Sequence, residues 1–123
     1  HQTRVIVDQA SFLRATKTAA IFARDGSGII RLQVGGDDGE GKLQISSRAE
    51  EVGENQGEID VTVDALEGDA KIAFNAKYLS EVLDVLGQGE VALEMTSPSS
   101  PGVLRPQGRD DYVHVVMPMF VQW

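Results

Sequence analysis

The C-terminal third of the chain reads Ser97-Pro98-Ser99-Ser100-Pro101-Gly102, then Val103-Leu104-Arg105-Pro106, and finally Tyr112-Val113-His114-Val115-Val116-Met117-Pro118-Met119. These segments predict a loop, a strand and a second strand. Pro118 has no backbone N–H to donate, so the sheet ladder is expected to stop there. The two methionines beside it carry flexible thioethers and would leave an apolar lip next to the loop, which suits a groove for a partner peptide. The alternative is that both methionines simply fill the core.

The residues before this segment predict a strand, a helix and a further strand. Residues 70–74 indicate a strand, residues 75–86 have the period of a helix, and residues 90–96 indicate the next strand. With strands at 103–105 and 112–116, the second half of the chain has the predicted order βαβββ.

The first half of the chain has the same predicted order. A strand at 4–7 leads into a helix at 12–24, whose N-cap is Asp8 or Ser11. Strands follow at 29–34, 42–47 and 58–63. The glycine-rich, acidic residues 35–41 are expected to separate the first two of these strands as a hairpin turn.

A short internal echo indicates a duplication. Val5-Ile6-Val7-Asp8 precedes Phe12-Leu13, and Ile72-Ala73-Phe74-Asn75 precedes Tyr78-Leu79. Each half offers one helix and about four strands, too few to bury both of its faces, so the halves must share a core. We therefore predict one α+β domain over 1–123, a duplicated βαβββ unit with halves of about 3–66 and 68–120. Both helices are expected on one side of antiparallel sheets.

The composition limits the location and the class of partner. The 123 residues include 19 acidic and 11 basic side chains and no cysteine, for a net charge of −8. The lack of cysteine fits a cytoplasmic location. No apolar run reaches the roughly 18 residues of a membrane-spanning helix, and the first residues form no signal-peptide pattern, so no membrane partner is expected. The negative charge favours a protein partner over nucleic acid, unless the basic residues are gathered on one surface.

Few residues are suited to catalysis or metal binding. The two histidines are His1 and His114, and the second lies in an alternating strand, where a structural role is expected. Ser46-Ser47 and Ser99-Ser100 have no obvious activating partner. The acidic residues within 37–40 lack the spacing of a calcium loop and are expected to form a solvated hairpin tip. We therefore expect no enzymatic activity, no cofactor and no metal.

Three segments resemble the C-terminal domain of the bacterial DNA polymerase III beta subunit, the sliding clamp. They are Phe74-Asn75-Ala76-Lys77-Tyr78-Leu79-Ser80-Glu81-Val82-Leu83, the loop 97–102 with its strand, and Asp110-Asp111-Tyr112 through Met117-Pro118-Met119. The resemblance runs from Arg4 to Met119, so it implies that the whole chain has the fold of a DNA-clamp domain.

The resemblance also implies a function. In that family three such domains form a subunit, and two subunits close head to tail into a ring around duplex DNA that tethers the replicative polymerase. A non-catalytic processivity factor of DNA replication is therefore implied, acting in the cytoplasm as part of the DNA polymerase III holoenzyme. The chain would be the third domain of a larger subunit. The residues alone leave open an alternative, a stand-alone peptide-binding module unrelated to DNA.

The first surface that the resemblance implies is a pocket for short linear motifs of the DNA polymerase III alpha subunit and the clamp loader. The matching positions are Tyr78, Ser99, Pro101, Val115, Met117, Pro118 and Met119. A pliable apolar slot with an aromatic wall suits an extended peptide anchored by Leu or Phe. The family usually ends Arg-Leu after Met-Pro-Met. This chain continues Phe120-Val121-Gln122-Trp123, which would either extend the slot or fold back over it.

The second implied surface faces DNA. The matching basic residues are Arg14, Lys17 and Lys77 on the two helices, together with Arg24 near the end of the first helix. Water-mediated phosphate contacts there would hold the duplex weakly and without sequence specificity. The alternative is an ordinary solvated helix face.

The third implied surface is the ring joint. Ile21 and Phe22 match an apolar pair that packs against the neighbouring subunit, although adjacent apolar residues near a helix end otherwise belong to the core. In the clamp one of the two is expected to be exposed when the partner is absent. Glu50, Glu51, Glu54 and Glu58 would face basic residues of the partner, and strand 58–63 would be the open sheet edge.

Overall fold

The computed structural model describes residues 3–24, 28–37, 39–49, 53–65, 70–87, 89–97, 99–107 and 113–119. Its elements follow in the order β1 (Thr3–Asp8), α1 (Gln9–Arg24), β2 (Ile29–Asp37), β3 (Glu40–Ala49), β4 (Gly53–Ala65), β5 (Lys71–Asn75), α2 (Ala76–Leu86), β6 (Glu90–Met95), β7 (Gly102–Pro106) and β8 (His114–Val116). This is the predicted βαβββ order, twice. No helix among the described residues is long and apolar enough to cross a membrane.

The two helices begin at equivalent caps. The Oδ2 atom of Asp8 accepts hydrogen bonds from the backbone N–H of Ser11 at 3.1 Å and from its hydroxyl at 2.9 Å. In α2, Oδ1 of Asn75 accepts from the N–H of Tyr78 at 2.9 Å. Each side chain satisfies a donor that the first helical turn leaves without a partner. Because Asp8 is the cap, α1 starts at Gln9, and the predicted start at Phe12 was three residues late.

The strands pair in the order β5-β2-β3-β4-β1-β6-β7-β8, and every pair is antiparallel. β1 joins the halves because it pairs with β4 on one side and with β6 on the other. Beyond β8, the N–H of Met119 donates to the carbonyl of Ala73 in β5 at 2.7 Å. The first and last strands of the order are therefore also connected.

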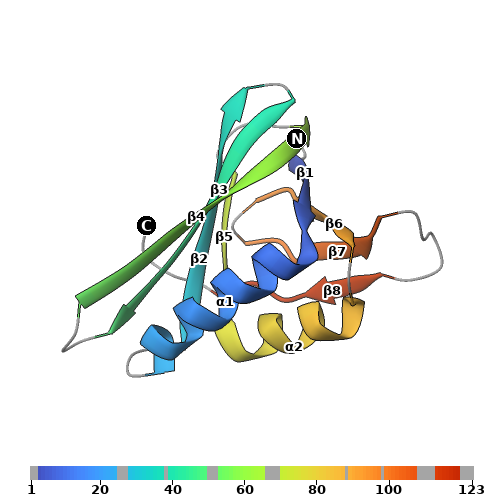
Figure 1. Ribbon diagram of the computed structural model, residues 1–123. Coiled ribbons are helices and arrows are strands. Elements are labelled where there is room, and N and C mark those ends of the chain that lie inside the picture. The colour runs from blue at the N-terminus through green and yellow to red at the C-terminus, as the bar shows by residue number, and fades with distance from the viewer. Residues whose placement is uncertain are drawn as a thin grey trace.

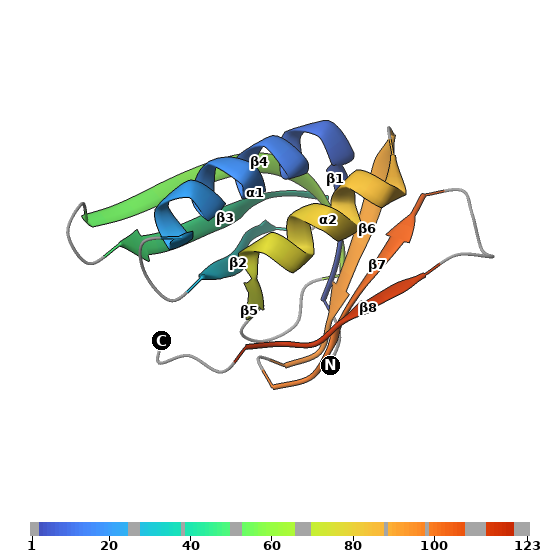
Figure 2. The same cartoon turned by 90° about the horizontal axis from the view of Figure 1, so that it is seen from below.

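Both helices cover the same side of the strands. Figure 1 shows α1 and α2 side by side in front of the sheet, and Figure 2, turned by 90°, shows both on one side of it. The predicted α+β class, with two helices on one side of antiparallel sheets, is therefore confirmed. The core lies between these layers, and its largest fully buried side chains include Phe12, Phe74, Ile30, Leu32, Leu43, Ile45, Leu79, Leu83, Leu93 and Leu104.

The connections between the helices repeat in the two halves. The N–H of Gln9 donates to the carbonyl of Gly89, just after α2, at 2.8 Å. The N–H of Ala76 donates to the carbonyl of Gly28, just after α1, at 2.9 Å. Both glycines have positive φ, 117° and 75°, which side chains with a Cβ rarely adopt. This pairing supports the predicted halves 3–66 and 68–120, which remain a proposal.

When the two halves are aligned by their helix caps, the alignment differs by one residue from the one that the sequence echo predicted. Asp8 corresponds to Asn75, so Phe12 corresponds to Leu79, and both of these side chains are fully buried. The residue that corresponds to Tyr78 is Ser11. The sequence echo had matched Tyr78 to Phe12 because both are aromatic, but only Phe12 belongs to the core, and Tyr78 is exposed.

Three strands, β2, β3 and β4, are longer than their hydrophobic patterns predicted. The β2–β3 ladder continues through the glycines as far as the pair Asp37 and Glu40, so residues 35–41 do not form a broad turn. A Cβ on Gly36 would lie 2.5 Å from the Cα of Gly41, so the two backbones pair more closely than side chains allow. β4 similarly starts at Gly53, five residues before the predicted strand.

Candidate functional site

An exposed apolar stripe lies along the last strand and its continuation. Alternate residues of a strand point to the same side, and Val113, Val115, Met117 and Met119 are all exposed. Met117 has 68% of its surface exposed. Between them, Val116 and Pro118 are buried. We call these four exposed residues the C-terminal stripe. The predicted pocket residues Val115, Met117 and Met119 belong to it, whereas Pro118 faces inward.

Tyr78 lies at the end of this stripe. The bond from Met119 to Ala73 fixes the end of the stripe against β5, which leads directly into the first turn of α2, where Tyr78 is 46% exposed. The Asn75 cap holds the backbone N–H of Tyr78. The hydrogen bond from Met119 to Ala73 thus connects the end of the stripe to the strand that leads into Tyr78, an exposed aromatic side chain of the kind that an apolar peptide can contact.

The serine-rich loop borders the same stripe. Gly102 pairs with Val116 in the β7–β8 ladder, which places the preceding Pro101 opposite Met117. The hydroxyl of Ser97 lies 3.2 Å from that of Ser99 and 2.9 Å from that of Ser100, so the loop forms a compact turn. Ser99 and Pro101 are exposed. The structure therefore brings the predicted loop residues beside the stripe, while Phe120–Trp123 and Tyr112 lie outside the described residues.

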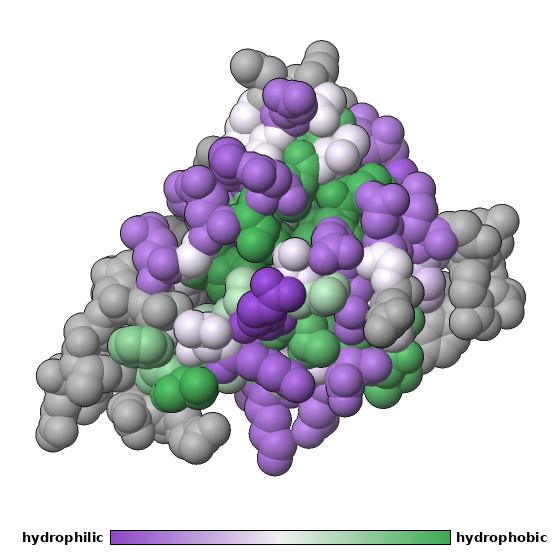
Figure 3. Space-filling view, viewed as in Figure 1, coloured by the Kyte–Doolittle hydropathy of each residue, from purple (hydrophilic) through white to green (hydrophobic). Residues whose placement is uncertain are grey.

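The predicted DNA-facing residues lie on the outer surface of the two helices. Arg14, Lys17 and Lys77 are exposed. Arg24 ends α1, and its side chain is outside the described part of the chain. Figure 3, seen from the same side as Figure 1, shows hydrophilic side chains interspersed with apolar ones over the face that the helices present. The exposed basic residues therefore lie on a mixed surface, which also carries exposed apolar side chains such as Val85.

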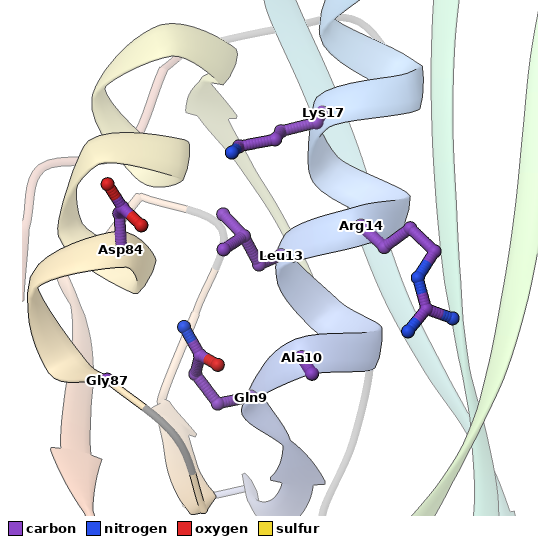
Figure 4. A pocket seen from close by; sticks show the side chains of 7 residues that line it. All are labelled: Gln9, Ala10, Leu13, Arg14, Lys17, Asp84 and Gly87. Carbon is purple, nitrogen blue, oxygen red and sulfur yellow. The ribbon is translucent and has the colours of Figure 1, made fainter.

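A cavity of about 450 Å³ lies between the two helices. Figure 4 shows its lining, which is Gln9, Ala10, Leu13, Arg14, Lys17, Asp84 and Gly87. At its base, the buried Gln9 donates from Nε2 to the carbonyl of Leu83 at 2.5 Å. Neither Gln9 nor Asp84 is among the site residues predicted from the sequence. Polar residues are common at the ends of helices and on their exposed faces, so the sequence around these two residues does not indicate a site.

The predicted ring joint lies near the other end of α1. Ile21 is 60% exposed and Phe22 is partly buried. β4 pairs with β3 over residues 53–61 and with β1 at residues 62, 63 and 65. The predicted open edge at 58–63 is therefore wrong at its C-terminal end, because β1 covers it. The part of β4 before Thr62 pairs with β3 alone, so one of its sides has no partner strand among the described residues.

The acidic residues predicted at this joint are described only in part. Glu58 is exposed, Glu54 is described in its backbone alone, and Glu50 and Glu51 lie outside the described residues. On the neighbouring strand, Lys42 pairs with Asp60, and this hydrogen bond raises the pKa of Lys42. Within the described residues no group of three His, Asp or Glu side chains is placed to hold a metal ion.

A row of charged side chains crosses four strands on a separate face. The Nε of Arg4 donates to Glu94 Oε2 at 3.0 Å, and the Nε of Arg105 donates to Glu94 Oε1 at 3.3 Å. Arg4 also pairs with Asp64, and this hydrogen bond raises the pKa of the guanidinium. The row joins β4, β1, β6 and β7, which spans the boundary between the two halves. These ion pairs therefore link strands of both halves.

Comparison with known proteins identifies relatives over almost the whole chain. The family model of the DNA polymerase III beta subunit, C-terminal domain, matches residues 1–120. The beta sliding clamp of Staphylococcus aureus (strain COL) is 29% identical over 120 residues, which are 97% of this chain and 30% of the relative. The chain thus spans about 30% of the length of the relatives that it matches.

Solved structures agree with this match. The beta subunit of DNA polymerase III from Thermotoga maritima superposes with a TM-score of 0.87 at 23% identity, over 98% of this chain and 31% of that one. The sliding clamp of Pseudomonas aeruginosa bound to griselimycin gives a TM-score of 0.82 at 29% identity, over 97% of this chain and 31% of that one. The first supports the fold alone, and the second supports both the fold and the family.

Proposed function

The chain belongs to the family of the C-terminal domain of the DNA polymerase III beta subunit, and on this premise we propose that it is the third domain of a ring-shaped sliding clamp. The ring would encircle duplex DNA and give DNA polymerase III its processivity. The domain would act without catalysis, cofactor or metal, in the cytoplasm. The match over residues 1–120 favours this function over a stand-alone peptide-binding module.

The observation that carries the proposal is the C-terminal stripe with Tyr78. Three of the stripe's side chains, Val115, Met117 and Met119, are large, apolar and exposed in a chain whose net charge is −8. Apolar side chains gathered at one exposed site mark a place where a partner binds. We propose that this site holds the linear motifs of the polymerase alpha subunit and the clamp-loader subunits, with Ser99 and Pro101 aligning the peptide backbone and Pro118 supporting the slot from within.

The helix face would form the wall of the ring that faces DNA. Arg14, Lys17 and Lys77 are exposed on α1 and α2, and Arg24 ends α1. Long basic side chains on a wide channel would reach phosphates through water and would not fix a register on the duplex. Binding to double-stranded DNA would be weak and independent of sequence.

The ring joint would use the exposed end of α1 and the free part of β4. Ile21 is an exposed apolar side chain, and β4 before Thr62 offers backbone groups to an added strand. An exposed apolar side chain beside a free sheet edge is suited to a head-to-tail contact with a second subunit. We propose that Ile21 and Phe22 make this contact.

Titration with a peptide of the Gln-x-x-Leu-Phe type tests the pocket. Backbone NMR shifts are expected at Tyr78, Ser99 and Met119, and they should vanish when Leu-Phe is replaced by Ala-Ala. Tyr78→Ala should weaken binding at least about tenfold, because a central aromatic contact is lost. Val85→Ala is the matched control, since Val85 is 66% exposed on the same helix and lies outside the proposed pocket.

The titration is repeated on the chain ending at Met119 and on the full-length protein. Binding that appears after truncation would show that the tail covers the slot, and binding only in the full-length protein would show that a preceding domain completes it. If the peptide binds none of the three proteins, or binds without regard to Leu-Phe, the pocket proposal is overturned.

A further inference from the structure

The two helices of the proposed DNA-facing wall differ in charge. α1 contains Arg14, Lys17 and Arg24 and no acidic residue. α2 contains Lys77, Glu81 and Asp84, so it has one more acidic than basic residue. Apart from Arg24, whose side chain is not described, all of these side chains are exposed. A phosphate backbone near this face would therefore be attracted by α1 and repelled by the second half of α2.

The basic residues of α1 also point in different directions. Figure 4 shows Lys17 extending from α1 toward α2, where Asp84 lines the same cavity. Arg14 points away from α2 in the same view. A carboxylate that faces an ammonium group across a shared cavity reduces the positive potential felt by an approaching anion. Lys17 thus extends toward the helix that carries Asp84, whereas Arg14 is directed away from that helix.

From this arrangement, and resting on the proposed function, we infer that the phosphate backbone of duplex DNA is held mainly by Arg14, on the side of α1 away from α2. Asp84 weakens the attraction of Lys17 and keeps the C-terminal half of α2 out of contact with DNA. The wall would thus contact the duplex along one helix, and Asp84 would be a residue that limits the strength of the contact.

NMR titration of the chain with a short DNA duplex tests this inference. The titration is run at an ionic strength of about 0.01 M, where the screening length is about 30 Å. Amide shifts are expected around Arg14 and at the first turn of α2, and not over residues 81–87. Arg14→Ala should weaken binding about threefold, and Lys17→Ala less than about twofold.

The decisive measurement is the coupling between Lys17 and Asp84. In the Asp84→Asn background, Lys17→Ala should weaken binding about threefold, as Arg14→Ala does, while the effect of Arg14→Ala should stay the same. Asp84→Asn alone should tighten binding about twofold. The control is Glu40→Gln, which removes the same charge at the start of β3, at the tip of the β2–β3 hairpin away from the helices (Figure 1).

The outcomes separate the inference from the proposed function. Shifts that cover both helices equally, or an Asp84→Asn effect no larger than that of Glu40→Gln, would overturn the inference and leave the DNA-facing wall standing. Shifts on neither helix, in the parent chain and in all variants, would overturn the wall and the inference together. Backbone spectra without DNA confirm that each variant is folded.

Discussion

The backbone N–H of Met119 donates a hydrogen bond to the carbonyl oxygen of Ala73, 2.7 Å away. Pro118 has no N–H of its own, so Met119 carries the first donor after it that can pair with β5. The bond fixes the end of the C-terminal stripe next to the start of α2. Two segments that are far apart in the sequence, the strand that leads into α2 and the last residues of the stripe, are thereby held together.

Gly102→Ala should destabilise the domain by about 1–3 kcal/mol, because a Cβ at this position would lie 2.4 Å from Cζ of the buried Phe74. Gly57→Ala is the matched control, since the nearest atom to a Cβ there, the carbonyl oxygen of Ile45, is 3.9 Å away. Urea unfolding followed by circular dichroism measures both. Equal effects at the two glycines would contradict the close approach.

Gln9→Ala should lower the free energy of unfolding by about 1–3 kcal/mol, because the buried carbonyl of Leu83 then loses its donor. Ser80→Ala removes an exposed hydroxyl bond to the carbonyl of Lys77 and should change stability by less than about 0.5 kcal/mol. Hydrogen exchange at the end of α2 should accelerate only in the first variant. Unchanged exchange there would show that Gln9 does not hold the helices together.

Glu94→Gln should cost about 1 kcal/mol, since Glu94 accepts from both Arg4 and Arg105 while partly shielded from water. The loss should shrink as salt is added, because the attraction between charges is screened. Lys42→Gln breaks a pair that is open to solvent and should leave the unfolding midpoint unchanged. A salt-independent loss for Glu94→Gln would point to packing as its cause.

Ile21→Glu in the full-length protein should raise the dissociation constant of the ring at least about tenfold, because the joint would then bury a charge in an apolar contact. The side chain is 60% exposed in the domain, so the free energy of unfolding should be nearly unchanged. Analytical ultracentrifugation measures the assembly, with Val85→Glu as the control on the other helix. A ring that survives Ile21→Glu with the affinity of the control would rule out this joint.

Local signals in the sequence were sufficient for the order of the elements. Apolar patterns and β-branched composition predicted every strand of the described chain, and Asp8 and Asn75 are side chains that cap helices. The boundaries were less accurate where glycine was present. Gly36 and Gly41 were interpreted as turn residues, but a ladder accepts glycine where two backbones approach closely, so β2 and β3 extend through them.

Locating the candidate sites required both the sequence motifs and the tertiary structure. The segment ending in Met117-Pro118-Met119 and its resemblance to the clamp family indicated which residues to examine. Periodicity could not tell an exposed methionine from a buried one, because both fit an alternating strand. The register of β8 against β7 is what turns Val115 and Met117 outward and Val116 and Pro118 inward.

By itself the sequence determined the α+β class, the duplicated order of elements and the family, because these depend on spacing along the chain and on recognisable motifs. The tertiary structure alone decided the contacts between distant residues. Arg4 meets Glu94 across a separation of 90 residues, and Gln9 meets Leu83 across 74. Such contacts depend on strand register and on how the helices pack over the sheet, and no local pattern encodes either of these.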